Sequence, residues 1–188
     1  MNDRDKSILW AREVISHPDE YLILDTETTG LGWGSEIVQI SIIDGHGNPL
    51  INTLVRPVYP IPADAMAIHG ITNEMVSIAQ PWPAIWPIVK KIMQGKKVII
   101  YNATYDITMI SSSCAQSKMD IPNMAPYQVA CAMHKYAAYV GDWDSRRGSY
   151  RWKKLPSGDH SAMGDVKATL DLIRMMAETP MTTGGSHA

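Results

Sequence analysis

The chain of 188 residues carries a net charge of −2, with 45% hydrophobic and 19% charged residues. These values indicate a soluble globular protein whose length suits one domain, predicted over residues 1–180, followed by a flexible tail over 181–188. No run of about 18 apolar residues occurs, which argues against a membrane helix. The charged N-terminus lacks an apolar signal core, and Cys114 and Cys131 have no metal-type spacing. These features favour a cytoplasmic protein with reduced thiols.

The first part of the chain is predicted to form a helix followed by three strands. Apolar residues at helical spacing favour a helix over 3–16. β-Branched and alternating residues predict strands over 21–27, 37–43 and 50–55, with a glycine-rich turn over 30–34. Because short turns join these strands, we expect an antiparallel meander.

Prolines punctuate the stretch over 56–87, which predicts a surface path in short helical pieces. Thr72 can cap one of these pieces, with Met75 and Val76 facing inward. Strands mixed with helices predict an α/β domain with a mixed sheet. The other predicted elements are a helix over 83–94, a buried strand over 97–101, a helix from 102 onward, a short strand near Tyr127, a helix over 129–140, an irregular stretch over 141–160 and a last helix over 161–180.

The first predicted strand ends in two acids on alternate positions, Asp25 and Glu27. Side chains alternate between the two faces of a strand, so these acids share one face. Two close carboxylates repel each other, and a divalent cation such as Mg²⁺ removes that conflict. Alternatively, the strand runs into a polar turn in which both acids are solvated. The short pattern alone does not decide between these interpretations.

Further acids recur at the ends of later predicted elements. Asp106 follows the fourth strand, and Asp165 lies near the start of the last helix, five residues after His160. A histidine on a loop can take a proton from water at neutral pH. Taken singly, Asp106 could be an acid that stabilises a helix start, and His160 a surface histidine. With the first pair, these residues form a constellation of four acids and one histidine.

Three segments resemble the motifs of the DnaQ-like DEDDh 3′–5′ exonuclease family. They are residues 25–30 (DTETTG), residues 101–106 (YNATYD), and His160 with Asp165. Residues 68–72 (IHGIT) also resemble a segment common in the bacterial, DNA-directed members. The resemblance implies a ribonuclease H-like fold, in which a five-stranded mixed sheet is flanked by helices.

The resemblance further implies a metal-dependent 3′–5′ exonuclease with the catalytic residues Asp25, Glu27, Asp106, His160 and Asp165. Asp25 would bridge two ions, Mg²⁺ or Mn²⁺, with Glu27 and Asp165 on the first and Asp106 on the second. Two ions about 4 Å apart can clamp the attacking and leaving oxygens of a phosphoryl displacement. His160 would deprotonate the attacking water. The products would be a 5′-mononucleotide and a strand shortened by one nucleotide.

Four more residues are implied to bind the substrate. Leu31 resembles an apolar wedge between the last two bases, and Thr28 resembles a backbone contact to the 3′-hydroxyl. His69 and Tyr105 resemble residues that pack on the terminal nucleotide. Each residue also has a structural alternative, which is turn packing for Leu31, a local cap for Thr28, a surface position for His69 and a core position for Tyr105.

The region before His160 departs from the family pattern. Lys154 and Leu155 precede His160 by only a few residues, where family members commonly place a longer helical segment. This shortening is expected to leave His160 less well held or to open one wall of the groove. Basic residues interleave with aromatic ones here, which suits a strand of phosphates and bases or, alternatively, a solvated loop. This basic cluster comprises Arg146, Arg147, Tyr150, Arg151, Trp152, Lys153 and Lys154.

The expected partner is the 3′ end of single-stranded DNA, on the likeness to DNA-directed family members. RNA is the alternative substrate, because no residue settles whether a 2′-hydroxyl is accepted. A third interpretation is a catalytically silent module that binds nucleic acid. Such a module would have lost one of the acids or the histidine, and this chain retains all five. Both a monomer and a homodimer are compatible with the sequence.

Overall fold

The computed structural model of the chain describes residues 1–181. The predicted flexible tail lies outside these residues, apart from Met181. No helix in the described part is both long enough and apolar enough to cross a membrane. The helices are α1 (Asp3–Ser16), η1 (Pro18–Glu20), α2 (Ala63–His69), α3 (Asn73–Ser77), α4 (Trp82–Met93), α5 (Ala103–Gln116), η2 (Ala125–Tyr127), α6 (Ala132–Val140) and α7 (Ala162–Glu178). The strands are β1 (Tyr21–Thr28), β2 (Ile37–Asp44), β3 (Pro49–Leu54), β4 (Lys97–Ile100), β5 (Val129–Cys131), β6 (Trp143–Asp144) and β7 (Ser149–Tyr150).

Five of these strands form one mixed sheet in the order β3-β2-β1-β4-β5. β2 pairs antiparallel with both β1 and β3, so the predicted meander is confirmed. β4 pairs parallel with β1, and β5 pairs parallel with β4. The strand that carries the first two acids therefore lies at the centre of the sheet.

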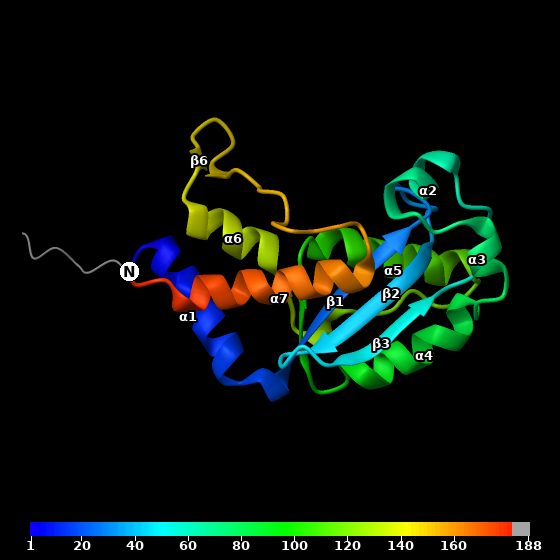
Figure 1. Cartoon of the computed structure of the whole chain (residues 1–188), viewed down its shortest axis with the longest axis horizontal. Helices are drawn as coiled ribbons and strands as arrows, with labels where there is room; N and C mark the ends of the chain where they lie inside the picture. The colour runs from blue at the N-terminus through cyan, green and yellow to red at the C-terminus, as the bar shows by residue number, and fades with distance from the viewer. Residues whose placement is uncertain (182–188) are drawn as a thin grey trace, which may run out of the picture.

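Helices cover both faces of the sheet (Figure 1). On one face, Leu24 of β1 is buried in a cluster with Trp86 of α4 and Met109 of α5. On the other face, Ile23 belongs to a cluster formed with α1, α6 and α7, which includes Leu170. Alternate residues of β1 thus pack against different helices, as the two-residue period of a strand requires.

This alternation also decides where the polar residues at the end of β1 point. Asp25 and Glu27 continue the row of Ile23 toward α7, whereas Thr26 continues the row of Leu24 toward α5. The register is set by the pairing with β2, in which Asp25 lies opposite Ser41. A slip by one residue would exchange the two rows and bury the acids in the wrong cluster.

Three local predictions are wrong. The helix predicted over 129–140 begins only at Ala132, because Val129–Cys131 pair with β4 as the edge strand β5. Met75 does not face inward, since 45% of it is exposed, whereas Val76 is buried as predicted. The stretch over 141–160, predicted to be irregular, contains the small β6–β7 hairpin.

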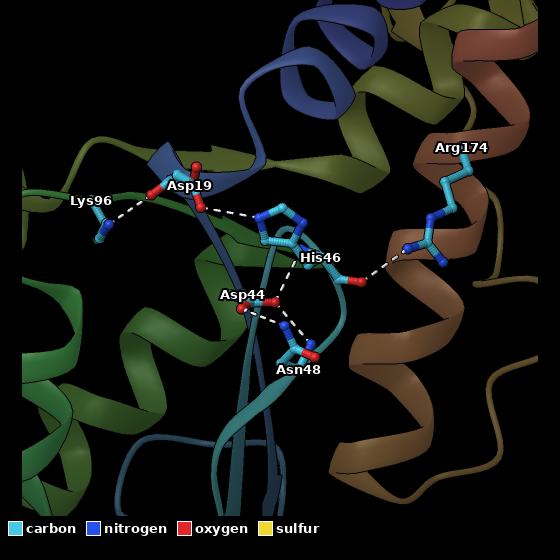
Figure 2. Close-up of polar contacts among 6 residues, drawn as sticks. All are labelled: Asp19, Asp44, His46, Asn48, Lys96 and Arg174. Carbon is cyan, nitrogen blue, oxygen red and sulfur yellow. Dashed lines mark hydrogen bonds and ion pairs between the residues drawn. The ribbon is translucent and has the colours of Figure 1, made fainter.

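A polar network holds the end of the sheet that lies opposite to the end of β1 (Figure 2). In the β2–β3 turn, Asp44 accepts hydrogen bonds from the backbone N–H of His46 and of Asn48, at 3.0 and 2.8 Å. The His46 ring lies 3.0 Å from a carboxylate oxygen of Asp19 in η1. Arg174 of α7 donates to the His46 carbonyl at 3.2 Å. The network therefore ties the C-terminal half of α7 to the sheet.

Gly45 in the same turn should not tolerate a side chain. An added Cβ would lie 2.4 Å from the carbonyl oxygen of Pro18 and 2.7 Å from its Cα, and backbone atoms cannot yield easily. We expect Gly45→Ala to reduce the free energy of unfolding by about 1–3 kcal/mol, measured by urea denaturation. Gly32→Ala is the matched control, because no heavy atom lies within 4 Å of its added Cβ. Equal stability of the two variants would contradict the packing described for this turn.

Candidate active site

Asp25, Glu27 and Asp165 come together where β1 ends. One carboxylate oxygen from each residue lies within 4.8 Å of the other two. Asp165 lies in the first turn of α7, which the Ser161 hydroxyl caps by accepting from the Gly164 N–H at 3.0 Å. The cap makes α7 begin beside the sheet, and so brings Asp165 to two acids that are distant in the sequence.

Asp106 reaches the same region from the opposite face of the sheet. It lies in the first turn of α5, is only 2% exposed, and accepts a hydrogen bond from the Thr26 hydroxyl at 2.7 Å. Thr26 is the residue between the two acids of β1, so this bond fixes Asp106 relative to both. The structure therefore places all four predicted acids around the end of one strand.

The acids repel one another and are poorly solvated. Burial raises the pKa of Asp25 well above its usual range, and the charges of Asp106, Asp165 and Glu27 raise it further. Burial, followed by the charges of Asp165 and Asp106, raises the pKa of Glu27 to about 8. Burial raises the pKa of Asp106 to about 7, although the Thr26 hydroxyl opposes that shift. Within residues 1–181, no lysine or arginine forms an ion pair with any of these acids.

This arrangement fits divalent cations. Hard cations of the Mg²⁺ and Mn²⁺ type prefer oxygen ligands, and a cluster of carboxylates without a basic partner supplies them. A bound cation would favour the ionised carboxylates and so offset the cost of keeping them close together.

His160 lies on the segment over 151–161, which we call the strap and which runs from β7 to α7 (Figure 1). A turn holds the histidine: the Asp159 carboxylate accepts from the N–H and the hydroxyl of Ser161, at 3.0 and 2.8 Å. The Asp159 N–H donates to Asp165 at 2.9 Å. His160 has a φ of 59°, a left-handed conformation that is unusual for a residue other than glycine. The short strap thus presents an exposed His160 beside the acids rather than leaving it unsupported.

Thr28 and Tyr105 support the turn that carries Leu31. Their hydroxyls contact each other, and the oxygen of each lies 2.9 Å from the Gly30 carbonyl oxygen, so the three groups share two hydroxyl protons. Leu31, the next residue, is 84% exposed. Because hydrogen bonds already fix this turn, a large apolar side chain on it can insert between bases without the entropic cost of ordering the backbone.

His69 is held in one tautomer by its neighbour. Its Nδ1 accepts the Ile71 N–H at 3.0 Å, so the neutral ring carries its proton on Nε2. Burial lowers the pKa of His69, which favours the neutral ring, and a contact with the backbone of Thr28 partly opposes this shift. Nε2 is buried without a hydrogen-bond partner of normal geometry. The ring is therefore held against the backbone near the end of β1, at the wall of the site.

All nine predicted site residues line one cavity of about 800 Å³. The cavity also includes residues that the sequence did not single out as site residues. Ile68 adjoins His69, and Asn102 lies within the motif that contains Asp106, so the motifs could have indicated that both residues lie at the site. No motif indicates the position of Asp64, because that position depends on the path of the proline-rich stretch. The unpredicted lining residues are Thr26, Gly30, Asp64, Ala65, Ile68, Tyr101, Asn102, Lys154, Leu155 and Gly158.

Comparison with known proteins identifies the class of enzyme. The family described as Exonuclease, of the RNase T type, matches residues 22–173. An uncharacterized exonuclease of Escherichia phage 186 is 38% identical over 174 residues, which cover 85% of this chain and 89% of the phage protein. The chain therefore belongs to the RNase T/DnaQ-like exonuclease family and is a 3′–5′ exonuclease, so the resemblance inferred from its motifs is confirmed.

Other relatives share the domain but are longer proteins. A DNA polymerase III subunit epsilon-like protein of Rhodobacter capsulatus is 37% identical over 178 residues, covering 88% of this chain and 25% of that protein. Exodeoxyribonuclease 10 of Escherichia coli is 40% identical over 85 residues, covering 45% of this chain and 37% of that protein. The matched residues thus span 25% and 37% of the length of these two relatives.

Solved structures support the ribonuclease H-like fold. Exonuclease I of E. coli in complex with a dT13 oligonucleotide superposes with a TM-score of 0.66 at 16% identity, covering 84% of this chain and 41% of that chain. The apo form of exonuclease I has a TM-score of 0.67 and covers 86% of this chain and 42% of that chain. At this identity the likeness concerns the fold alone. Dependence on divalent metal is typical of the family to which the chain belongs.

The raised pKa of Glu27 predicts an unusual pH dependence of stability in the metal-free protein. Between about pH 4.5 and about 8, the folded state holds a proton on Glu27 that the unfolded state has lost. The contribution of this group to stability is therefore full below about pH 4.5 and is lost as the pH rises toward 8. With EDTA, we expect Tm to fall across this range more steeply in the wild type than in Glu27→Gln.

Added Mg²⁺ should reverse that loss. A cation that binds only the folded state at about 100 times its Kd adds about 2.7 kcal/mol, and the gain should be greater at the higher pH. Differential scanning fluorimetry at several pH values, with EDTA and with Mg²⁺, measures both effects. Parallel Tm curves for the wild type and Glu27→Gln in EDTA would contradict the repulsion described for the acids.

Proposed function

We propose that this exonuclease hydrolyses the terminal phosphodiester of single-stranded DNA from the 3′ end and releases 5′-mononucleotides by a two-metal mechanism. The observation that carries the proposal is the group formed by Asp25, Glu27 and Asp165, with Asp106 beside it, in a cavity that also includes His160. Phosphodiesters are anionic, so a cavity lined by carboxylates accepts them only when cations bind there as well.

The acids would hold two divalent ions, with Asp25 between them, Glu27 and Asp165 on the first and Asp106 on the second. Mg²⁺ or Mn²⁺ would supply charge stabilisation of the transition state and activation of water. His160 would accept the proton of the attacking water at an imidazole nitrogen. The water oxygen then bonds to phosphorus as the bond to the 3′ oxygen of the preceding nucleotide breaks. The leaving oxygen takes up a proton and becomes the new 3′-hydroxyl.

The remaining site residues would place the last nucleotide over the acids. Leu31 would separate the last two bases, which suits its 84% exposure at the rim of the cavity. His69 and Tyr105 would pack on the terminal nucleotide, since both line the cavity. Thr28 would contact the 3′-hydroxyl through its backbone, since its side chain is already bonded to Gly30.

The preference for DNA rests on the names of relatives, which include an exodeoxyribonuclease and a DNA polymerase III epsilon-like protein. The exonuclease I structures with single-stranded oligonucleotides support the same substrate class. RNA remains the second candidate, because an RNA exonuclease is 24% identical over 165 residues.

Product analysis tests this proposal. DNA and RNA of one sequence, each labelled on the 3′-terminal nucleotide, are incubated with the protein and Mg²⁺. We expect the label to appear at once as a 5′-mononucleotide, and faster from DNA than from RNA. Faster release from RNA would change the assigned substrate. Release of the label within longer fragments would overturn the exonucleolytic mechanism.

A further inference from the structure

The strap connects the active-site cavity to the β6–β7 hairpin. The hairpin stands above α6, and the strap runs from it to the region where β1 ends, near α2 (Figure 1). Lys154 and Leu155 of the strap line the cavity. A polymer that leaves the cavity along the strap therefore passes Trp152 next and then the hairpin.

Acids of the hairpin neutralise only part of the basic cluster. Lys153 lies 2.6 Å from Asp142, and Arg151 lies 3.5 Å from Asp144. Arg147 lies 3.8 Å from Asp144, in a more exposed ion pair. The pairs of Lys153 and Arg151 hold the strap to the hairpin, and the pair of Arg147 lies within the hairpin, so these three cations already have anionic partners.

Two cations of the cluster stay available. Arg146 and Lys154 are exposed and take part in none of the ion pairs formed within residues 1–181. Lys154 contributes a positive charge to a cavity whose other charged lining groups are chiefly acids. Free cations at both ends of residues 146–154 can contact phosphates of one strand.

Trp152 lies between these cations in the sequence and presents a flat apolar surface. It is 67% exposed, and its ring lies 6.2 Å from the ring of His134 on α6. The segment beneath it is anchored, because the Tyr101 hydroxyl donates to the Lys153 carbonyl at 2.8 Å. The Tyr150 hydroxyl donates to Asp3 of α1 at 3.0 Å. An exposed ring on an anchored segment is a platform on which a base can stack at low entropic cost.

We propose that Lys154, Trp152 and Arg146 form an upstream track that binds the single-stranded part of the substrate 5′ to the nucleotide being removed. This inference rests on the proposed function, because it assigns a path to the strand whose 3′ end lies over the acids. Single-stranded nucleic acid fits the track better than a protein does, since free cations alternate with a stacking ring along a path into a phosphodiester-binding cavity.

Binding and hydrolysis, measured separately, test the track. Binding of a labelled thymidine oligonucleotide of about 16 nucleotides is followed by anisotropy with Ca²⁺ in place of Mg²⁺. Hydrolysis is followed on the 4-nitrophenyl ester of thymidine 5′-monophosphate, which has no upstream strand. Trp152→Ala should weaken oligonucleotide binding by about 5- to 100-fold and leave ester hydrolysis unchanged. Trp152→Phe should keep most of the binding.

Salt dependence reports on the cations. Arg146→Ala should reduce the slope of log K against log salt concentration by about 0.7, the value for one phosphate contact to a single strand. Lys91→Ala, on the exposed surface of α4 across the sheet, is the charge-matched control and should leave the slope unchanged.

The outcomes separate this inference from the proposed function. Unchanged oligonucleotide binding in Trp152→Ala and Arg146→Ala would overturn the track. The exposed groups of the hairpin would then be better explained as a surface that binds a protein. Equal losses on the oligonucleotide and on the ester would show a structural role for Trp152, which also overturns it. The proposed function fails if the wild type hydrolyses neither DNA nor the ester. The track is still supported in that case if both variants bind the oligonucleotide more weakly than the wild type does.

Discussion

Asp25→Asn is expected to reduce kcat/KM on single-stranded DNA by about 10³-fold or more, a loss of about 4 kcal/mol of transition-state stabilisation. Asparagine keeps the shape of the side chain and removes its charge. The charges of Asp106, Asp165 and Glu27 all raise the pKa of Asp25, which places it among the other acids. Its loss should therefore weaken the binding of both proposed ions. The same substitution should leave the metal-free protein at least as stable as the wild type, because it removes a poorly solvated carboxyl group whose ionised form is repelled by three neighbouring acids.

The combination of lost activity and retained stability distinguishes a catalytic role from a folding defect. Activity is measured on 5′-labelled DNA, and Tm is measured in EDTA and in Mg²⁺. Asp120→Asn is the control, since this exposed acid lies outside the cavity. A variant Asp25→Asn that kept its activity, or that still gained the full Tm increment from Mg²⁺, would contradict the assignment.

His160→Ala is expected to lower kcat by about 10²- to 10⁴-fold, the usual range for loss of a general base. The Tm increment from Mg²⁺ should stay close to that of the wild type, because the four acids are intact. The pair of measurements separates proton transfer from metal binding. Loss of the Mg²⁺ increment in His160→Ala would instead assign the histidine to the metal site.

The backbone of His160 offers a second control. Its φ of 59° favours asparagine over alanine, since asparagine adopts the left-handed region more readily. His160→Asn should therefore preserve the turn formed by Asp159 and Ser161 and still lose the activity. If His160→Asn recovered most of the rate, the histidine would act by shaping the strap and not as a base.

Much of the fold follows from local patterns in the sequence. The alternation of residues in β1 is enough to place Asp25 and Glu27 on one face. Buried neighbours such as Ile23 allow β1 to pair with β2 in one register only. The motifs then indicated which distant residues join them, and the cavity lining includes all nine predicted residues. Their individual roles remain proposals that the substitutions above test.

Other features depend on contacts between distant segments and could not be predicted. β5 is only three residues long and exists because it pairs with β4. Glu36 is 3% exposed and accepts the backbone N–H groups of Val58 and Tyr59 at 2.8 and 3.0 Å. This buried carboxylate anchors the proline-rich stretch that leads to α2 and His69, and no local pattern indicates such a role.

Metal-dependent shortening of a 5′-labelled single strand of DNA tests the central claim most directly. Protein treated with EDTA is mixed with the DNA, and Mg²⁺ or Mn²⁺ is then added in excess over the chelator. We predict no cleavage in EDTA, a ladder that shortens one nucleotide at a time from the 3′ end once metal is present, and no ladder with Asp25→Asn. Cleavage that persists in EDTA, or internal cuts that precede the ladder, would contradict the account.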